Sequence, residues 1–519
     1  MNIEETASLK NASDEVQVLQ KQAENQEFSS EKLKNTVIVD SKETFESDDN
    51  GQELNFFEYT AEEEKTVLRK IDRFVLPVMC FVFFSQYLDK QVLAYTVVFG
   101  LETDLNLDGN QYSWLSSAFY LAQLASQFAN GYLLSKFPVK YVTACSIIIW
   151  SAICMCLAAP NDFKGFVTVR AFLGFFEGAV SPSFVIITSV YYKKKEHALR
   201  TATWVSCNAI TQIIGTFLVY GIGKNSHIKL AVWKVTFIIC GCITLFFGIL
   251  FFIAIPFNPG NAWFLNEKER KIAVERILAE SDRGEKKSFD MNQLKECLNF
   301  DWLTISSFLF GFLVTVTSGP ISFSSLIIES FGYDSFKTLA YGSPSGAVQL
   351  CFIWIGVLMT TLFPKHRTII VQILIIVPII GNILLLALPE SDSWGVIVGS
   401  WLGCCITSFM CILLSLNASN VRGNTKKSLV NNSFFAGYCL AAIVYPQWWN
   451  YTKDPRYRTG LITNLVFWGI LEALMVFYRW KVFHENKKRD ELEAKGLIPD
   501  YTGCTDLTDK QDLCHRYSC

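Results

Sequence analysis

The sequence predicts an all-α membrane protein with twelve transmembrane helices in two sets of six. Three observations support this prediction. The 519 residues are 51% hydrophobic and their mean hydropathy is +0.27, which is too apolar for an ordinary soluble domain. Apolar segments close to the ~20 residues of a spanning helix recur along the chain. The 42 Phe and 13 Trp residues suit lipid-facing helices with aromatic belts at their ends.

Short polar loops separate the apolar segments, and the polar stretch 257–302 divides them six and six. We therefore expect an N-terminal half at 65–256 and a C-terminal half at 303–480, with an acidic, disordered tail at 1–64 and a polar tail at 481–519. The predicted spans are 74–98, 112–134, 140–159, 166–191, 201–222, 233–256, 303–328, 341–363, 368–388, 393–416, 429–448 and 459–480.

Lysine and arginine residues mark one side of the predicted bundle. They gather before the first span and in alternate loops, whereas the loop 101–111 has no basic residue. Because basic loops stay in the cytosol, both tails and the central stretch should be cytosolic. The first span follows a polar tail and should act as a membrane anchor rather than a cleaved signal peptide. A glycosylation sequon at Asn450 falls in an outer loop close to the membrane, where we expect it to stay unused.

Three places depart from simple spanning helices. In the central stretch, Asn266 is placed to cap a surface helix over 267–277. Pro320 interrupts the seventh span, and residues 343–346 interrupt the start of the eighth. Each interruption has two interpretations, which are unwound backbone lining a cavity and a packed kink.

The fourth span carries two opposite charges, Arg170 and Glu177, which share one face of a helix. A charge in hydrocarbon costs roughly 2.5–3.5 kcal/mol, so it persists where it faces protein or water. At ~1.5 Å per residue the two lie some 10 Å apart along the axis, which favours separate roles over a direct bond. The small residues Gly174, Gly178 and Ala179 should let a neighbouring helix come close. We interpret this helix as the charged wall of a translocation pathway.

A second charged pair, Asp89 and Lys90, lies past the middle of the first span. Adjacent helical residues point in different directions, so each needs its own partner. Lys90 and Arg170 would attract a carboxylate or sulfonate, while Asp89 and Glu177 could take up protons. The alternative for these charges is static pairing between helices. Polar side chains that could contact substrate, or instead bond neighbouring helices, are Gln123, Gln127 and Gln349.

The chain offers little support for other kinds of chemistry. Its 16 cysteines include no CxxC pair, so neither a disulfide framework nor a zinc site is expected. All five histidines fall in loops or tails, so proton transfer within the membrane would have to use carboxylates. No nucleophile–base pair, metal-ligand spacing or phosphate-binding loop is apparent. We expect a protein that is not an enzyme and that uses no cofactor, metal or nucleic acid.

Short motifs, in order over residues 60–490, resemble those of a known transporter family. They are Tyr87-Leu-Asp-Lys90, Arg170-x-x-Leu-Gly-x-x-Glu177, the runs 192–200 and 262–276, Pro344-Ser-Gly-Ala347, Asn424-Thr-Lys-Lys427, Gly437-Tyr-Cys-Leu440 and Pro446-Gln447. The set is similar to the fungal anion:cation symporter family of the major facilitator superfamily, and particularly to its allantoate-permease-like branch.

This resemblance implies two pseudo-symmetric halves that give alternating access to a central site. It implies transport of small organic anions such as ureides, vitamins or sulfur compounds, usually with protons. Related anion transporters use an acidic–basic pair in helix one and an Arg…Glu pair in helix four, which correspond here to Asp89–Lys90 and Arg170–Glu177. Many members have arginine where this chain has Lys90, a point charge that lacks the bidentate fork.

The predicted function is therefore proton-coupled import of a small organic anion by a monomer in the lipid bilayer of a fungal plasma membrane. The anion would be a carboxylate like allantoate or ureidosuccinate, a vitamin acid or a sulfur compound. Two alternatives stay open. One is a non-transporting nutrient sensor, for which the polar tails give some support. The other is a uniporter or exchanger on an internal membrane.

Overall fold

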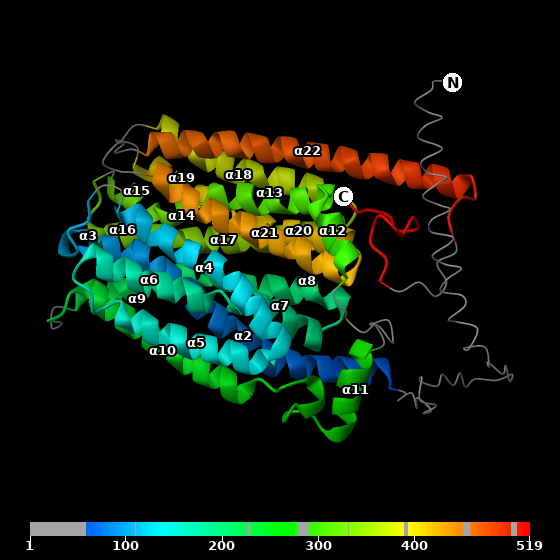
Figure 1. Cartoon of the computed structure of the whole chain (residues 1–519). Coiled ribbons are helices and arrows are strands. Elements are labelled where there is room, and N and C mark those ends of the chain that lie inside the picture. The colour runs from blue at the N-terminus through cyan, green and yellow to red at the C-terminus, as the bar shows by residue number, and fades with distance from the viewer. Residues whose placement is uncertain are drawn as a thin grey trace. The chain divides into compact units, whose positions relative to one another are not determined.

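The computed structural model describes residues 59–108, 111–225, 229–278, 290–330, 332–388, 393–449, 457–499 and 506–519. Within these ranges, residues 59–519 form one unit, a bundle of long helices without a strand (Figure 1). The predicted all-α class is confirmed. Asn450 and nearly all of the predicted N-terminal tail lie outside the described residues.

The N-terminal half begins at Ala61, a few residues before the expected boundary at 65. A capping box explains this start, because Thr60 accepts from the backbone N–H of Glu63 while the Glu63 side chain accepts from that of Thr60. The elements of this half are α2 (Ala61–Val97), α3 (Leu101–Asp104), α4 (Gln111–Lys136), α5 (Val139–Cys156), α6 (Phe163–Glu177), α7 (Val180–Tyr191), α8 (Lys194–Val205), α9 (Cys207–Lys224) and α10 (Val232–Ala254).

The central stretch contains the surface helix that the sequence predicts. This helix follows Asn266, and Glu269 in its first turn pairs with Lys70 of α2 at 2.6 Å. The central elements are η1 (Pro259–Asn261), α11 (Glu267–Leu278) and α12 (Met291–Leu298).

Both interruptions expected in the C-terminal half are present, with a helix break next to Pro320 and another at Ser343. The last helix continues to Ala494, well past the predicted end of its span at 480. The elements are α13 (Trp302–Val316), α14 (Gly319–Ser322), α15 (Ser324–Ser330), α16 (Ser335–Gly342), α17 (Pro344–Leu362), α18 (Arg367–Ala387), α19 (Ser393–Gly403), α20 (Thr407–Asn420), α21 (Asn424–Val444), η2 (Tyr445–Trp448) and α22 (Arg458–Ala494).

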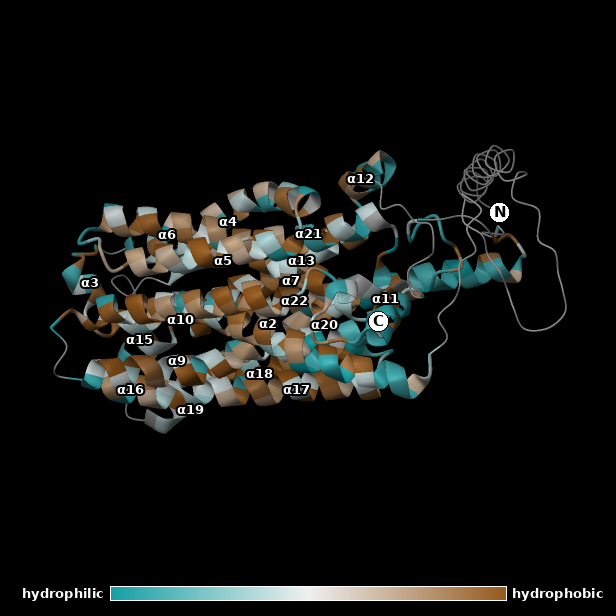
Figure 2. Ribbon diagram, turned by 90° about the horizontal axis from the view of Figure 1, so that it is seen from below, coloured by the Kyte–Doolittle hydropathy of each residue, from teal (hydrophilic) through white to brown (hydrophobic). Residues whose placement is uncertain are grey.

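Ten helical segments of the described residues are long and apolar enough to cross a membrane. The helices α2 and α4 run through the same bundle, packed on α10 and α6, and complete the predicted twelve. Hydrophobic residues line most of the bundle, and hydrophilic residues gather at one end, near α11 and the last turns of α22 (Figure 2). The charge pattern predicts that this end faces the cytosol. We call it the inner end and the opposite end the outer end.

Hydrogen bonds join the two halves at the outer end and in the middle of the bundle. At the outer end, the hydroxyl of Ser117 donates to the carbonyl of Ile443 at 2.7 Å, and that of Ser335 donates to the carbonyl of Val98 at 3.0 Å. The rings of Phe99 and Phe336 meet beside them, 5.7 Å apart. The halves are thus in direct contact on the side where Figure 1 shows α3, α15 and α16.

Candidate functional site

An ion pair between helices one and four lies at the centre of the charged site. Lys90 Nζ of α2 is 2.8 Å from Glu177 Oε1 of α6. The Glu177 side chain is fully buried and that of Lys90 is 18% exposed. Breaking a pair of this kind strands the remaining charge away from water, which is strongly destabilising. Any step that separates Lys90 from Glu177 therefore needs a replacement charge or a proton.

Arg170 lies on the same face of α6 as Glu177 and is 3% exposed. Its guanidinium carbon is 5.6 Å from the ring centre of Phe119 on α4, and Lys90 Nζ is 5.7 Å from the same ring. Within the described residues no ion pair joins Arg170 to Glu177, as their separation along the helix predicts. The Nε and Nη1 atoms of Arg170 are buried without a hydrogen-bond partner in the described part of the chain. A planar cation with unused donors is suited to a carboxylate.

Small residues bring α4 and α6 together at this site, as the sequence predicts. A Cβ on Gly174 would lie 2.1 Å from the carbonyl oxygen of Phe119, and one on Gly178 would lie 2.2 Å from Ser126 Oγ. The fourth span is one membrane-length segment, Phe163–Tyr191, in which α6 ends at Glu177 and α7 begins at Val180. The two residues between them, Gly178 and Ala179, keep right-handed helical backbone angles, so the local irregularity directly follows the buried carboxylate.

Asp89 has different partners from its neighbour Lys90 and is buried between helices of the N-terminal half. Its carboxylate accepts from Trp150 Nε1 at 2.6 Å, from Thr244 Oγ1 at 3.1 Å and from Cys154 Sγ at 3.5 Å. All three donors are uncharged and belong to α5 and α10. The sequence indicated that Asp89 needs its own partner, but it gave no signal for Trp150 and Thr244, because they lie on distant helices.

The three glutamines proposed as substrate contacts occupy different positions. Gln123 is 6% exposed, and its Oε1 has no hydrogen-bond partner in the described residues. Gln127 donates to the carbonyl of Gly178 at 3.4 Å. Both therefore lie at the contact of α4 with the fourth span. Gln349 lies elsewhere, on α17 of the C-terminal half.

Gln349 forms part of a polar bridge between the two halves. Its Oε1 accepts from Gln212 Nε2 of α9 at 2.9 Å, and its own Nε2 donates to Thr407 Oγ1 at 2.5 Å. The oxygen of Gln212 accepts from Ser345 Oγ at 3.1 Å. The backbones are also close, since a Cβ on Gly346 would lie 2.4 Å from the carbonyl oxygen of Ala209. A small cavity next to the bridge is lined by Gln91, Tyr95, Gln212, Thr216, Ser325 and Ser345.

Two tyrosines also meet across the halves: Tyr120, which the sequence did not single out, and Tyr438 of the Gly437–Leu440 motif. The rings of Tyr120 on α4 and Tyr438 on α21 pack edge to face with their centres 5.9 Å apart. The site therefore combines cations from the N-terminal half with neutral polar and aromatic groups from both halves.

Known proteins are similar to this chain in sequence and in fold. The sequence model of the Major Facilitator Superfamily matches residues 79–446. An uncharacterized transporter of Schizosaccharomyces pombe is 36% identical and covers 89% of this chain and 87% of its own. Two relatives from Saccharomyces cerevisiae are each 30% identical. These are the thiamine pathway transporter THI73, with 92% of this chain and 91% of that relative covered, and the allantoate permease, with 90% and 89% covered.

Solved structures add a likeness in fold. The proton:xylose symporter XylE has a TM-score of 0.60 at 16% identity, over 80% of this chain and 96% of that one. A bacterial homologue of the human lysosomal transporter Spinster has a TM-score of 0.58 at 14% identity, over 80% and 97%. At these identities the likeness concerns the fold alone.

Proposed function

Because the chain belongs to the Major Facilitator Superfamily, we propose that it imports a small organic anion together with protons by alternating access. It is a multi-pass membrane transporter rather than an enzyme, and its relatives include members of the allantoate-permease-like branch that its motifs predicted. The anion, the protons and a plasma-membrane location are the parts that we propose.

The observation that supports an anionic substrate is the unsatisfied guanidinium of Arg170. A buried cation with two unpartnered nitrogens is costly unless a ligand supplies acceptors. A carboxylate placed between Arg170 and Lys90 would supply them, next to the Phe119 ring that both cations approach. The neutral part of the substrate would face Gln349 and Tyr438 of the C-terminal half.

The pairing of Lys90 with Glu177 supports the proposed proton coupling. An anion that binds Lys90 competes with Glu177 for the same charge. Glu177 would then be a buried carboxylate without its cation, and taking up a proton would remove this cost. Asp89 would be a second proton carrier. Its neutral donors give a carboxylate hydrogen bonds but no counter-charge.

Coupling also makes uptake electrically favourable at the plasma membrane of a fungal cell. A negative-inside potential opposes the entry of an anion by about 2.3 kcal/mol per charge per 100 mV. Entry of more than one proton with each monoanion reverses this opposition. We propose a ureide carboxylate such as allantoate as the first substrate to test, because an allantoate permease is among the relatives.

Uptake assays in a yeast strain that lacks its own carriers would test this function. Labelled allantoate, ureidosuccinate, vitamin acids and sulfur compounds would be tested in turn. For one of them, uptake should saturate with concentration, be competed by the unlabelled compound and fall when a protonophore is added. Uptake that ignores external pH and the protonophore would instead indicate a uniporter or exchanger. Signalling without measurable flux would indicate a sensor.

Substitution of Glu177 by glutamine tests the coupling step. The Glu177→Gln variant keeps the shape of the side chain but cannot carry a proton. We expect uptake to lose its dependence on external pH, while counterflow of the same anion persists. Glu472→Gln, at a half-buried position of α22, is the matched control and should behave as the wild type. Wild-type pH dependence in Glu177→Gln would contradict this role.

A further inference from the structure

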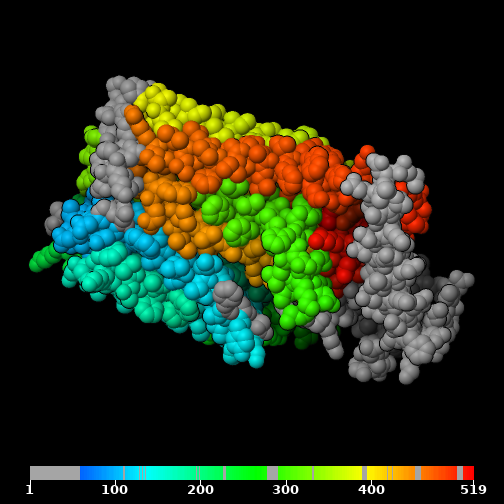
Figure 3. All heavy atoms as spheres, turned by 45° about the horizontal axis from the view of Figure 1, so that its top comes forward, coloured from blue at the N-terminus to red at the C-terminus, as the bar shows by residue number. Residues whose placement is uncertain are grey.

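Residues 506–519, which we call the tail segment, pack against the inner end of the C-terminal half. In Figure 3 the tail segment, drawn in red, lies against the green atoms of α12 and α13 and the orange-red atoms of α22. The sequence predicted a polar tail here. The structure gives this segment many specific contacts, and several of them involve buried charges.

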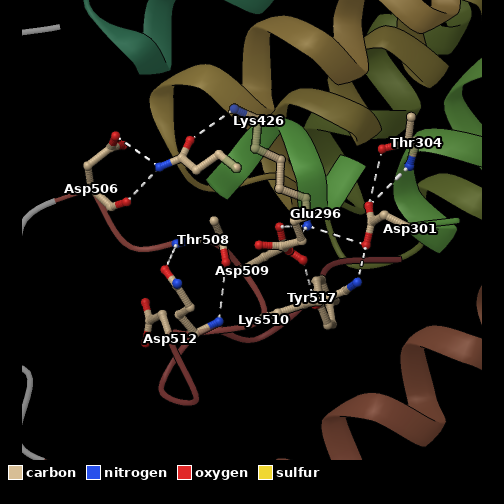
Figure 4. Close-up of polar contacts among 12 residues, drawn as sticks. Glu296, Asp301, Thr304, Lys426, Asp506, Thr508, Asp509, Lys510, Asp512 and Tyr517 are labelled. Atoms are coloured by element: carbon tan, nitrogen blue, oxygen red, sulfur yellow. Dashed lines mark hydrogen bonds and ion pairs between the residues drawn. The ribbon is translucent and has the colours of Figure 1, made fainter. Parts of the chain in front are cut away.

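The first set of contacts surrounds Lys426, at the start of α21. Its side chain is fully buried and lies 2.7 Å from Asp509 of the tail segment, 2.7 Å from Glu296 and 3.4 Å from Asp301. Lys510 of the tail segment pairs with Asp301 at 2.8 Å (Figure 4). Buried charges are tolerated when they are paired and hydrogen-bonded. The tail segment thus contributes both an anion and a cation to a cluster that joins α12, α13 and α21.

The second set of contacts satisfies Arg489, a 5% exposed residue of α22. It donates to the carbonyl of Asp509 at 2.6 Å, to the hydroxyl of Tyr517 at 2.8 Å and to the carbonyls of Asp512 and His515. Its guanidinium also lies 4.2 Å from the centre of the Tyr517 ring. Every one of these partners belongs to the tail segment.

The third set of contacts recognises backbone rather than side chains. The amide of Asn486 both accepts from the N–H of Tyr517 and donates to its carbonyl, each at 2.9 Å. The amide of Asn420 accepts from the N–H of Ser518 at 2.7 Å and donates to its carbonyl at 2.8 Å. The backbone N–H of Arg367 donates to the carbonyl of Cys519 at 2.8 Å. Such paired backbone contacts are characteristic of a groove that binds an extended peptide.

We propose that the inner end of the C-terminal half is a peptide-binding groove for the tail segment, and that docking of this segment sustains turnover of the carrier. The segment connects α12, α13, α18, α20, α21 and α22, so it holds their inner ends as one body. The hydrogen bonds and ion pairs given above join it to the C-terminal half and to the adjoining helices α12 and α22. Docking of the segment therefore stiffens this moving part. This inference rests on transport activity but not on the identity of the anion.

Thiol labelling measures docking without any substrate. Cys519 is 7% exposed in the docked segment, so a maleimide should label it slowly in the full-length protein, as followed by peptide-resolved mass spectrometry. Arg489→Met removes the side chain that donates most of the hydrogen bonds to the tail segment. We expect Cys519 to be labelled at least about tenfold faster in this variant, because hydrogen bonds to a charged group are strong. Lys488→Met, the same charge change at an exposed neighbour, should label as the wild type. Equal slow labelling in Arg489→Met would overturn the groove.

Transport measurements test the effect on turnover. With allantoate as the probe anion, Arg489→Met at equal membrane abundance should show a several-fold lower maximal rate with an unchanged KM, while Lys488→Met keeps the wild-type rate. A chain ending at residue 505 should lose rate in the same way in inside-out vesicles. A synthetic peptide of residues 506–519 should restore it, and a peptide carrying Asp509→Ala and Tyr517→Ala should not. Full turnover without the segment would overturn its role in transport. If the wild type itself does not transport allantoate, the anion was chosen wrongly. The labelling experiment needs no substrate, so it still tests the docking of the segment in that case.

Discussion

At the scale of single residues, the site depends on two cations in different situations. Lys90 is held by Glu177, whereas Arg170 keeps unused donors next to Phe119. In our proposal Arg170 makes the geometrically demanding contact with the anion and Lys90 supplies a charge that can be exchanged. The lysine at position 90, where many members of the resembling family have arginine, is consistent with this division, because a point charge imposes no bidentate geometry.

Replacing Arg170 by lysine separates charge from geometry. The Arg170→Lys variant keeps the positive charge but loses the planar fork, so we expect the KM for the anion to rise about tenfold, which corresponds to ~1.4 kcal/mol of binding free energy. Concentration-dependent uptake measures it. Arg479→Lys, which changes an arginine of α22 that donates to Thr368 at 3.1 Å, serves as the control. An unchanged KM in Arg170→Lys would show that the fork does not contact the substrate.

The sequence could identify these charges but not their partners. The spacing of seven positions from Arg170 to Glu177 predicted one shared helix face, and that prediction is confirmed because both side chains are buried in α6. The partners Trp150 and Phe119 are distant in sequence and of ordinary type, so they carried no recognisable pattern. The roles in transport of all the proposed site residues stay predictions; these residues are Asp89, Lys90, Gln123, Gln127, Arg170, Glu177 and Gln349.

At the scale of elements, the contact between α4 and α6 positions Phe119 against Arg170. Gly174→Ala should push the helices apart, since the new Cβ would lie 2.1 Å from a backbone oxygen that cannot rotate away. We expect a loss of about 1–3 kcal/mol in stability, seen as a lower unfolding temperature in detergent. Gly221→Ala in α9 is the matched control, because a Cβ there meets nothing within 4 Å. Equal unfolding temperatures for the two variants would contradict this close contact.

Helix ends matched the prediction where a proline or a capping residue at the site determines them. Pro320 and the residues around Ser343 interrupt helices as expected, and the helix after Asn266 begins at Glu267, as expected. The irregular turn at Gly178 and Ala179, inside the fourth span, had no sequence signal of its own, because small residues also serve close packing. The extension of α22 to Ala494 was not foreseen either, because a helix that leaves the membrane continues on polar residues without an apolar signal.

At the scale of the whole molecule, alternating access requires the outer contacts between the halves to open. Cysteines placed at Phe99 and Phe336, whose rings are 5.7 Å apart, should be joined by a short bifunctional thiol reagent. We expect the cross-linked double variant to lose uptake and a reducible cross-link to return it on reduction. Each single variant, treated alike, controls for the natural cysteines. Full uptake by the cross-linked protein would mean that the halves do not separate there.

The distribution of charge between the halves has a consequence for how such carriers diversify. Asp89, Lys90, Arg170 and Glu177 all lie in the N-terminal half, and the C-terminal half contacts that half through Gln349, which binds Gln212, and Tyr438, which packs on Tyr120. Selectivity for a negatively charged group would then reside in the N-terminal half, and selectivity for the shape of the substrate in the C-terminal half. The two halves could be exchanged independently. A chimaera that joins this N-terminal half to the C-terminal half of a relative would therefore still transport anions. Its selectivity among anions would be that of the relative.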